Sequence, residues 1–104
     1  MMAMDYIRKN YMDPDLSLNS ICSYLNISTS YFSTIFKEMT GETFIESLTR
    51  IRMEKAKELL TGTNMKIVNI SEQVGYPNVS YFVQSFREYF GVSPQKFRDQ
   101  GELS

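Results

Sequence analysis

Apolar side chains recur along this chain at intervals of three and four residues, the spacing of helices that bury one face. Residues that favour helix ends separate these stretches: Ser17 and Ser28 can begin a helix, and Gly41 and Gly91 can end one. The pattern predicts an all-α fold of about seven helices, over residues 4–12, 18–25, 28–40, 44–60, 67–74 and 78–90, with a short last turn after Ser93.

The same spacing predicts which faces are buried. Two of the helices carry their buried side chains at positions i, i+3, i+4 and i+7: Phe32, Ile35, Phe36 and Met39 in one, and Phe82, Ser85, Phe86 and Tyr89 in the other. The long helix between them has an apolar stripe with flanking residues: Leu48, Ile51, the stem of Lys55 and Leu59, flanked by Ile45, Ala56 and Leu60. Thr43 and Glu46 have the spacing of a capping box at its start.

The chain also repeats itself. Ser30-Tyr31-Phe32 returns as Ser80-Tyr81-Phe82, and Phe36-Lys37-Glu38 returns as Phe86-Arg87-Glu88. The helix before each of these stretches matches too, with Leu18, Ile21, Cys22 and Leu25 corresponding to Ile67, Ile70, Ser71 and Val74. The offset grows by one residue between the two matches, which places an extra residue in the second turn, near Pro77. The repeated unit is therefore a short helix, a tight turn and a longer helix.

This outline fits two kinds of protein. It is the outline of the helix-turn-helix motif, in which the second helix enters the major groove of DNA. It is equally the outline of an ordinary helical hairpin, and a pair of such hairpins can form a protein-interaction module that does not bind DNA. Spacing alone leaves both interpretations open.

Longer stretches resemble a known family. They read SYFSTIFKEMTGETF at 30–44, RMEKAKELL at 52–60, IVNISEQVGY at 67–76 and SYFVQSFREYFGVSPQKFR at 80–98, and they resemble the AraC/XylS-type DNA-binding domain of bacterial transcription regulators. The resemblance implies a helix-turn-helix subdomain in residues 1–43, a linker helix in 44–62 and a second such subdomain in 63–104. It implies sequence-specific binding of double-stranded DNA, with helices 28–40 and 78–90 in successive major grooves.

The resemblance also assigns residues to contacts. Base contacts fall on exposed positions of the two recognition helices: Ser30, Ser33, Thr34, Ser80, Tyr81 and Gln84. Phosphate contacts are expected from helix N-termini and basic side chains: Ser28, Thr29, Lys37, Arg52, Lys66, Asn78, Arg87 and Arg98. Each serine or threonine could equally be a solvated surface residue, Arg52 could have a structural role instead, and Tyr31 is expected to pack against a neighbouring helix.

Charge limits how tightly such a domain could bind. The formal net charge is −1 and the isoelectric point is near 5.4, whereas affinity for DNA comes largely from neutralised phosphates. Residues 29–98 hold nine basic and seven acidic side chains. We therefore expect weak binding by an isolated monomer and a need for dimerisation or for a second domain. Neither recognition helix has an arginine in its N-terminal half, which predicts modest or AT-leaning specificity.

Composition excludes several other functions. The chain has no His and one Cys, so His-based catalytic triads, Cys/His zinc sites and an internal disulfide are excluded. It has no phosphate-binding loop and no long apolar run. We expect no enzyme activity, no cofactor or metal, no membrane span and a cytoplasmic location. The resemblance further implies RNA polymerase as a partner. It also implies an absent N-terminal sensing, receiver or dimerisation domain, such as that of a two-component response regulator.

Overall fold

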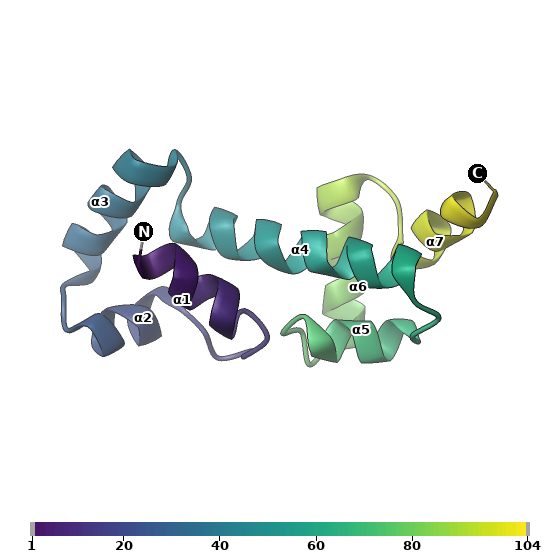
Figure 1. Cartoon of the computed structure of the whole chain (residues 1–104), viewed down its shortest axis with the longest axis horizontal. Coiled ribbons are helices and arrows are strands. Elements are labelled where there is room, and N and C mark those ends of the chain that lie inside the picture. The colour runs from purple at the N-terminus through teal and green to yellow at the C-terminus, as the bar shows by residue number, and fades with distance from the viewer. Residues whose placement is uncertain (1, 104) are drawn as a thin grey trace.

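The computed structural model describes residues 2–103 and contains seven helices in that range (Figure 1). Their bounds are α1 Met2–Asn10, α2 Leu18–Leu25, α3 Thr29–Thr40, α4 Phe44–Gly62, α5 Ile67–Gln73, α6 Val79–Phe90 and α7 Pro94–Leu103. The all-α fold predicted from the apolar spacing is confirmed. α7 is longer than the predicted short turn and continues through Gly101. No helix of the described residues is both long enough and apolar enough to cross a bilayer.

Local chemistry sets the ends of the central helices. At the start of α4, the backbone amide of Glu46 donates to Thr43 Oγ1 at 3.1 Å, and the amide of Thr43 donates to Glu46 Oε1 at 2.9 Å, which confirms the predicted capping box. Gly41 and Gly91 end α3 and α6 with φ values of 79° and 83°, a left-handed conformation that glycine adopts without strain.

The buried side chains form two separate cores. The first contains Ile7, Ile21, Cys22, Phe32, Phe36, Phe44 and Leu48, together with Ala3 and Leu16. The second contains Met53, Ala56, Leu60, Ile70, Val74, Tyr76, Phe82 and Phe86. We call the parts of the chain built on these cores the first and second subdomains. α4 supplies side chains to both, so it is an integral part of each subdomain and not a free connector.

Some side chains expected in the core lie at the surface. Met39 is 66% exposed, Tyr89 45% and Ile45 60%. Met39 and Tyr89 occupy the same position of the repeat, in the last turn of α3 and of α6. Helical periodicity gives the direction in which a side chain points, but it does not say whether another element lies opposite. At these positions the neighbouring elements cover the side chain only in part.

The molecule is elongated, with extents of 47 × 24 × 20 Å. The two subdomains lie toward opposite ends of α4, and in the view of Figure 1 α2 and α5 both lie below α4. α3 and α6 are both steeply inclined to α4 in the same view. The sequence repeat therefore appears in space as two similar helix pairs carried along one central helix.

Candidate nucleic-acid interface

α3 presents a polar outer face because its apolar face is held in the first core. Phe32 and Phe36 are buried, whereas four predicted contact residues of this helix are exposed: Ser30, Ser33, Thr34 and Lys37. The helix begins after Ser28, whose Oγ accepts a hydrogen bond from the amide of Tyr31 at 3.2 Å. Thr29, the first helical residue, is half-buried. The structure thus brings the predicted contacts of the first subdomain together on one surface.

α6 repeats this arrangement in the second subdomain. Phe82 and Phe86 are buried, and the predicted contact residues Ser80, Tyr81, Gln84 and Arg87 are exposed. The cap is Asn78, whose Oδ1 accepts from the amide of Tyr81 at 3.0 Å. Tyr81 is 60% exposed, and its ring centroid lies 5.8 Å from that of Tyr76.

Two of the predicted base-contacting side chains are already hydrogen-bonded. Thr34 Oγ1 donates to the carbonyl of Ser30 at 3.1 Å, so the methyl group of Thr34 is its more available part. Gln84 Nε2 donates to Glu88 Oε1 at 3.3 Å. This bond is long and exposed, so exchanging it for a pair of bonds to an adenine edge costs little.

The outer faces of α3 and α6 flank the same stretch of α4. A hollow of about 450 Å³ is bounded by Ile45 of α4 and by Ser33, Thr34 and Lys37 of α3, among others. A second hollow, of about 390 Å³, is bounded by the same Ile45 and by Asn78 and Tyr81 at the start of α6. Because one residue of α4 borders both hollows, a single rod-shaped ligand lying along this stretch could contact both helices.

Three of the predicted phosphate-contacting side chains are basic and exposed. Lys37 and Arg87 are exposed in the last turns of α3 and α6. Lys66 is exposed at the N-terminus of α5 and makes no capping hydrogen bond with its side chain. All three placements leave the ammonium or guanidinium group available to an anion.

Arg52 does not fit the phosphate contact predicted for it. Its residue exposure is 8%, and Nε donates to the carbonyl of Tyr11 at 2.9 Å while Nη2 donates to that of Asp13 at 2.8 Å. The guanidinium carbon lies 5.4 Å from the ring centroid of Tyr76. Burial lowers the pKa of Arg52 and raises that of Tyr76. Arg52 is therefore not placed to contact a phosphate, and that prediction is corrected. Its contacts fit the alternative, a structural role.

Arg98 is also held by the protein. Its Nε donates to the carbonyl of Leu60 at 3.0 Å, and Nη2 donates to that of Thr63 at 3.3 Å. Both carbonyls belong to the C-terminal end of α4, where a positive charge also meets the negative end of the helix dipole. Arg98 therefore anchors α7 to α4, and because its side chain is only half-buried, the phosphate contact stays a prediction.

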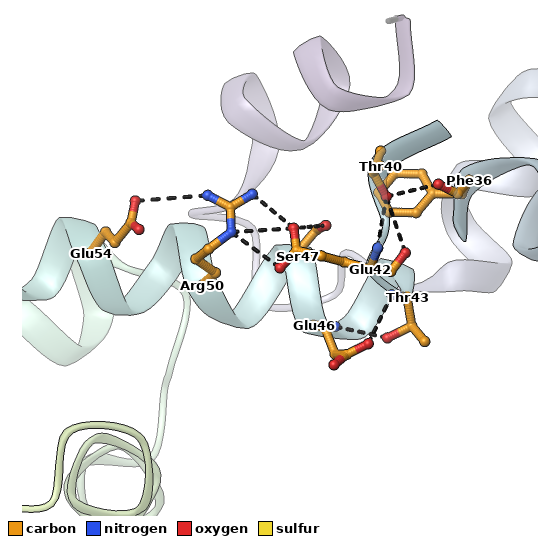
Figure 2. A network of polar contacts seen from close by, with 8 residues as sticks. All are labelled: Phe36, Thr40, Glu42, Thr43, Glu46, Ser47, Arg50 and Glu54. Atoms are coloured by element: carbon orange, nitrogen blue, oxygen red, sulfur yellow. Dashed lines mark hydrogen bonds and ion pairs between the residues drawn. The ribbon is translucent and has the colours of Figure 1, made fainter. Parts of the chain in front are cut away.

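A polar network fixes the turn between α3 and α4 (Figure 2). Glu42 accepts from Ser47 Oγ at 2.8 Å and from Arg50 Nη2 at 3.0 Å, and Arg50 also approaches Glu54 at 3.8 Å. The hydrogen bonds from Arg50 lower the pKa of Glu42, and Glu42 in turn raises the pKa of Arg50. The network ties the turn after α3 to the first three turns of α4.

The structure adds residues to this surface that the sequence does not predict there. Tyr31, expected to pack against a helix, is 62% exposed beside Ser30. Ile45 and Thr49 line the hollows along α4. The sequence repeat offers a signal for the exposure of Tyr31, because its counterpart in the second copy, Tyr81, is one of the predicted base contacts.

Comparison with known proteins identifies the family. A family model described as "Helix-turn-helix domain" matches residues 21–100. The C-terminal domain of AraT, a response regulator from Geobacillus stearothermophilus, is 43% identical, with a TM-score of 0.93 over 95% of this chain and 82% of that chain. The chain belongs to the AraC/XylS-type helix-turn-helix family.

Other relatives agree with this AraC/XylS-type assignment. The C-terminal domain of the two-component response regulator yesN from Fusobacterium nucleatum is 37% identical, with a TM-score of 0.88 over 90% of this chain and 91% of that chain. The raffinose operon transcriptional regulatory protein RafR of Pediococcus pentosaceus is 34% identical over 97 residues, which are 93% of this chain and 35% of that protein. The chain spans about a third or less of the length of the curated relatives that it matches.

Proposed function

We propose that this AraC/XylS-type domain binds double-stranded DNA in a sequence-specific manner to regulate transcription, with α3 and α6 in successive major grooves. The observation that carries the proposal is the shared border at Ile45, which lies between the polar outer faces of both helices. Two recognition helices on opposite sides of the molecule could not reach one duplex.

The dimensions suit two adjacent grooves. α4 has 19 residues, and at about 1.5 Å per residue it spans roughly 28 Å. Major-groove segments on one face of B-DNA are about 34 Å apart. The molecule is 47 Å long, because the subdomains extend beyond the ends of α4. Any remaining mismatch would be met by bending the DNA, which costs on the order of 1–6 kcal/mol.

The proposed contacts divide into two kinds. Base edges would be read by Ser30, Ser33 and Thr34 of α3 and by Ser80, Tyr81 and Gln84 of α6. Phosphates would be bound by Lys37, Lys66 and Arg87 and by the N-terminal amides beside the caps, with Ser28, Thr29 and Asn78 next to them. With this division, residues 1–43 and 63–104 would act as two reading units and α4 would set their separation.

The domain would act as part of a longer regulator. Its relatives are regulators of which it matches about a third or less, so a sensing, receiver or dimerisation domain is the natural complement. The net charge of −1 supports this, because a second DNA-bound copy would double the phosphate contacts. We propose that the regulator acts in the bacterial cytoplasm and that it changes transcription through contact with RNA polymerase.

Selection from a random DNA pool tests the proposal. The 104-residue chain should enrich a site of two short parts whose centres lie about one helical turn, roughly 10–10.5 base pairs, apart. Gln84→Ala should relax one position in one part only, and Ser33→Ala should act on the other part. An unenriched pool, with binding to a protein that salt does not weaken, would instead support a protein-interaction module.

A further inference from the structure

Arg52 lies in the middle of α4, at the boundary between the two cores. Leu48, four residues before it, belongs to the first core, and Met53, directly after it, belongs to the second. Among the described residues, Arg52 is the only charged residue that is buried. Burying a guanidinium group costs free energy unless hydrogen bonds satisfy it. The hydrogen-bond partners of Arg52 therefore indicate its role.

Those partners come from both subdomains. The carbonyls of Tyr11 and Asp13, which accept from Nε and Nη2 at 2.9 and 2.8 Å, belong to the loop after α1 in the first subdomain. Tyr76, whose ring faces the guanidinium at 5.4 Å, lies in the turn between α5 and α6 in the second. That turn leads directly to Asn78, the cap of α6. Arg52 therefore links the loop of one subdomain to the base of the recognition helix of the other.

Gly75 shows that the same loop and turn also meet through their backbones. A Cβ atom at this position would lie 2.5 Å from the carbonyl oxygen of Tyr11 and 2.9 Å from Arg52 Nε. Its φ of 93° is a further reason for glycine. The turn before α6 thus sits directly against the loop after α1, and no other residue type would let the two approach so closely.

We propose that Arg52 is a positioning residue that locks the two subdomains in one relative orientation and so sets the spacing of DNA half-sites that the domain accepts. The second part of this statement rests on the proposed function, whereas the first does not. If α4 were the only connection, bending of this helix would change the orientation of one subdomain relative to the other. The contacts through Arg52 and Gly75 add a second connection, and two connections between two bodies restrict their relative rotation far more than one.

This role requires arginine, whereas a phosphate contact could be made by any positively charged side chain. The planar group of arginine donates from two nitrogens in fixed directions while it lies against an aromatic ring. A lysine has a single ammonium and cannot hold both carbonyls and the ring in this geometry. Arg52→Lys therefore keeps the charge that a phosphate contact would use and loses the lock.

The first experiment measures orientation without DNA. Spin labels at Glu38→Cys and Glu88→Cys, two exposed positions of α3 and α6, report the distance between the recognition helices by pulsed electron paramagnetic resonance. The otherwise unaltered chain should give one narrow distance distribution, and both Arg52→Met and Arg52→Lys should broaden it. Lys57→Met, which removes an exposed charge from the same helix, should leave it narrow. Should Arg52→Met fail to fold by circular dichroism, Arg52→Lys carries the test. A distribution as narrow in Arg52→Lys as in the parent chain overturns the proposal.

The second experiment measures the accepted spacing. The selected DNA site is varied by inserting or removing one to three base pairs between its halves. The parent chain should lose affinity about tenfold or more, because a rigid pair of modules cannot engage both halves at the wrong distance. Arg52→Lys should lose less than about threefold over the same series, since mobile modules tolerate the change. Equal losses of affinity in the parent chain and in Arg52→Lys would overturn the proposed role of Arg52 in setting the spacing. If the parent chain binds no DNA at all, the proposed function fails, and the label distances still decide whether the lock exists.

Discussion

At the scale of single residues, Glu42 shows how one carboxylate holds a recognition helix in place. It joins the turn after α3 to Arg50 of α4 at 3.0 Å, with both side chains about a third exposed. We predict that Glu42→Gln lowers the free energy of unfolding at pH 7 by about 0.5–1 kcal/mol, the range of partly exposed ion pairs. Urea titration followed by circular dichroism measures the change.

The effect of Glu42→Gln should depend on pH in a defined direction. Because the folded state lowers the pKa of Glu42, its stabilisation is present above the ordinary glutamate range and is lost as pH falls through the lowered pKa. Parent and variant should therefore differ at pH 7 and converge as the pH falls below the ordinary glutamate range. Glu54→Gln is the matched control, since Glu54 lies 3.8 Å from Arg50 and is 55% exposed. An equal loss from both variants would contradict the special role of Glu42.

Ser71 is the residue on which the turn of the second subdomain depends. It is fully buried, and its Oγ donates to the carbonyl of Tyr76, in the turn that contacts Arg52. We predict that Ser71→Ala costs about 1–3 kcal/mol of unfolding free energy, because the Tyr76 carbonyl loses a buried partner. Ser85→Ala, at a half-buried serine of α6, should cost less in the same urea titration. Similar costs for the two would show that the buried bond contributes little.

At the scale of helices, the caps of α3 and α6 combine two roles that one substitution can separate. Aspartate caps a helix as well as serine or asparagine does, and its charge suits the positive end of the helix dipole. Asn78→Asp and Ser28→Asp should therefore keep the melting temperature, yet lower DNA affinity about three- to tenfold at low salt, because a carboxylate would face a phosphate. Ser93→Asp, at the start of α7, adds the same charge away from α3 and α6 and should leave affinity unchanged. Unchanged affinity in all three would exclude the proposed N-terminal phosphate sites.

Helices and their ends were predictable because the signals are local. A capping side chain such as Thr43 and a stop such as Gly41 act within a few residues, and the structure has both. The exposure of Met39 was not predictable, because it depends on what lies opposite in space. The role of Arg52 was open for the same reason, since its partners Tyr11 and Asp13 are about 40 residues away in the chain. The outward faces of α3 and α6 followed from their buried aromatic residues, but their shared border at Ile45 required the fold.

At the scale of the whole molecule, net charge and surface placement together predict how salt should act on binding. The chain carries a net charge of −1, and Arg52 is buried while Arg98 is hydrogen-bonded to the end of α4. The proposed phosphate-binding side chains that are basic and exposed are Lys37, Lys66 and Arg87. Each neutralised phosphate contributes about −0.9 to the slope of log affinity against log salt, so three such contacts give a slope of roughly −3.

Substitutions should separate the contribution of charge to DNA affinity from the contribution of base contacts to sequence discrimination. Lys37→Met and Arg87→Met should each make the salt slope shallower by about one, with affinity lost equally for all sequences. Gln84→Ala should leave the slope unchanged and reduce discrimination at one base pair by about 1–3 kcal/mol. Fluorescence anisotropy over a salt series measures both quantities, and Lys57→Met controls for loss of a charge elsewhere. A slope of about −5 or steeper for the parent chain would mean further phosphate contacts. Since Arg52 is buried, those contacts would have to come from Arg98, from other exposed basic side chains such as Arg8 and Lys96, or from a second copy of the domain on the same DNA.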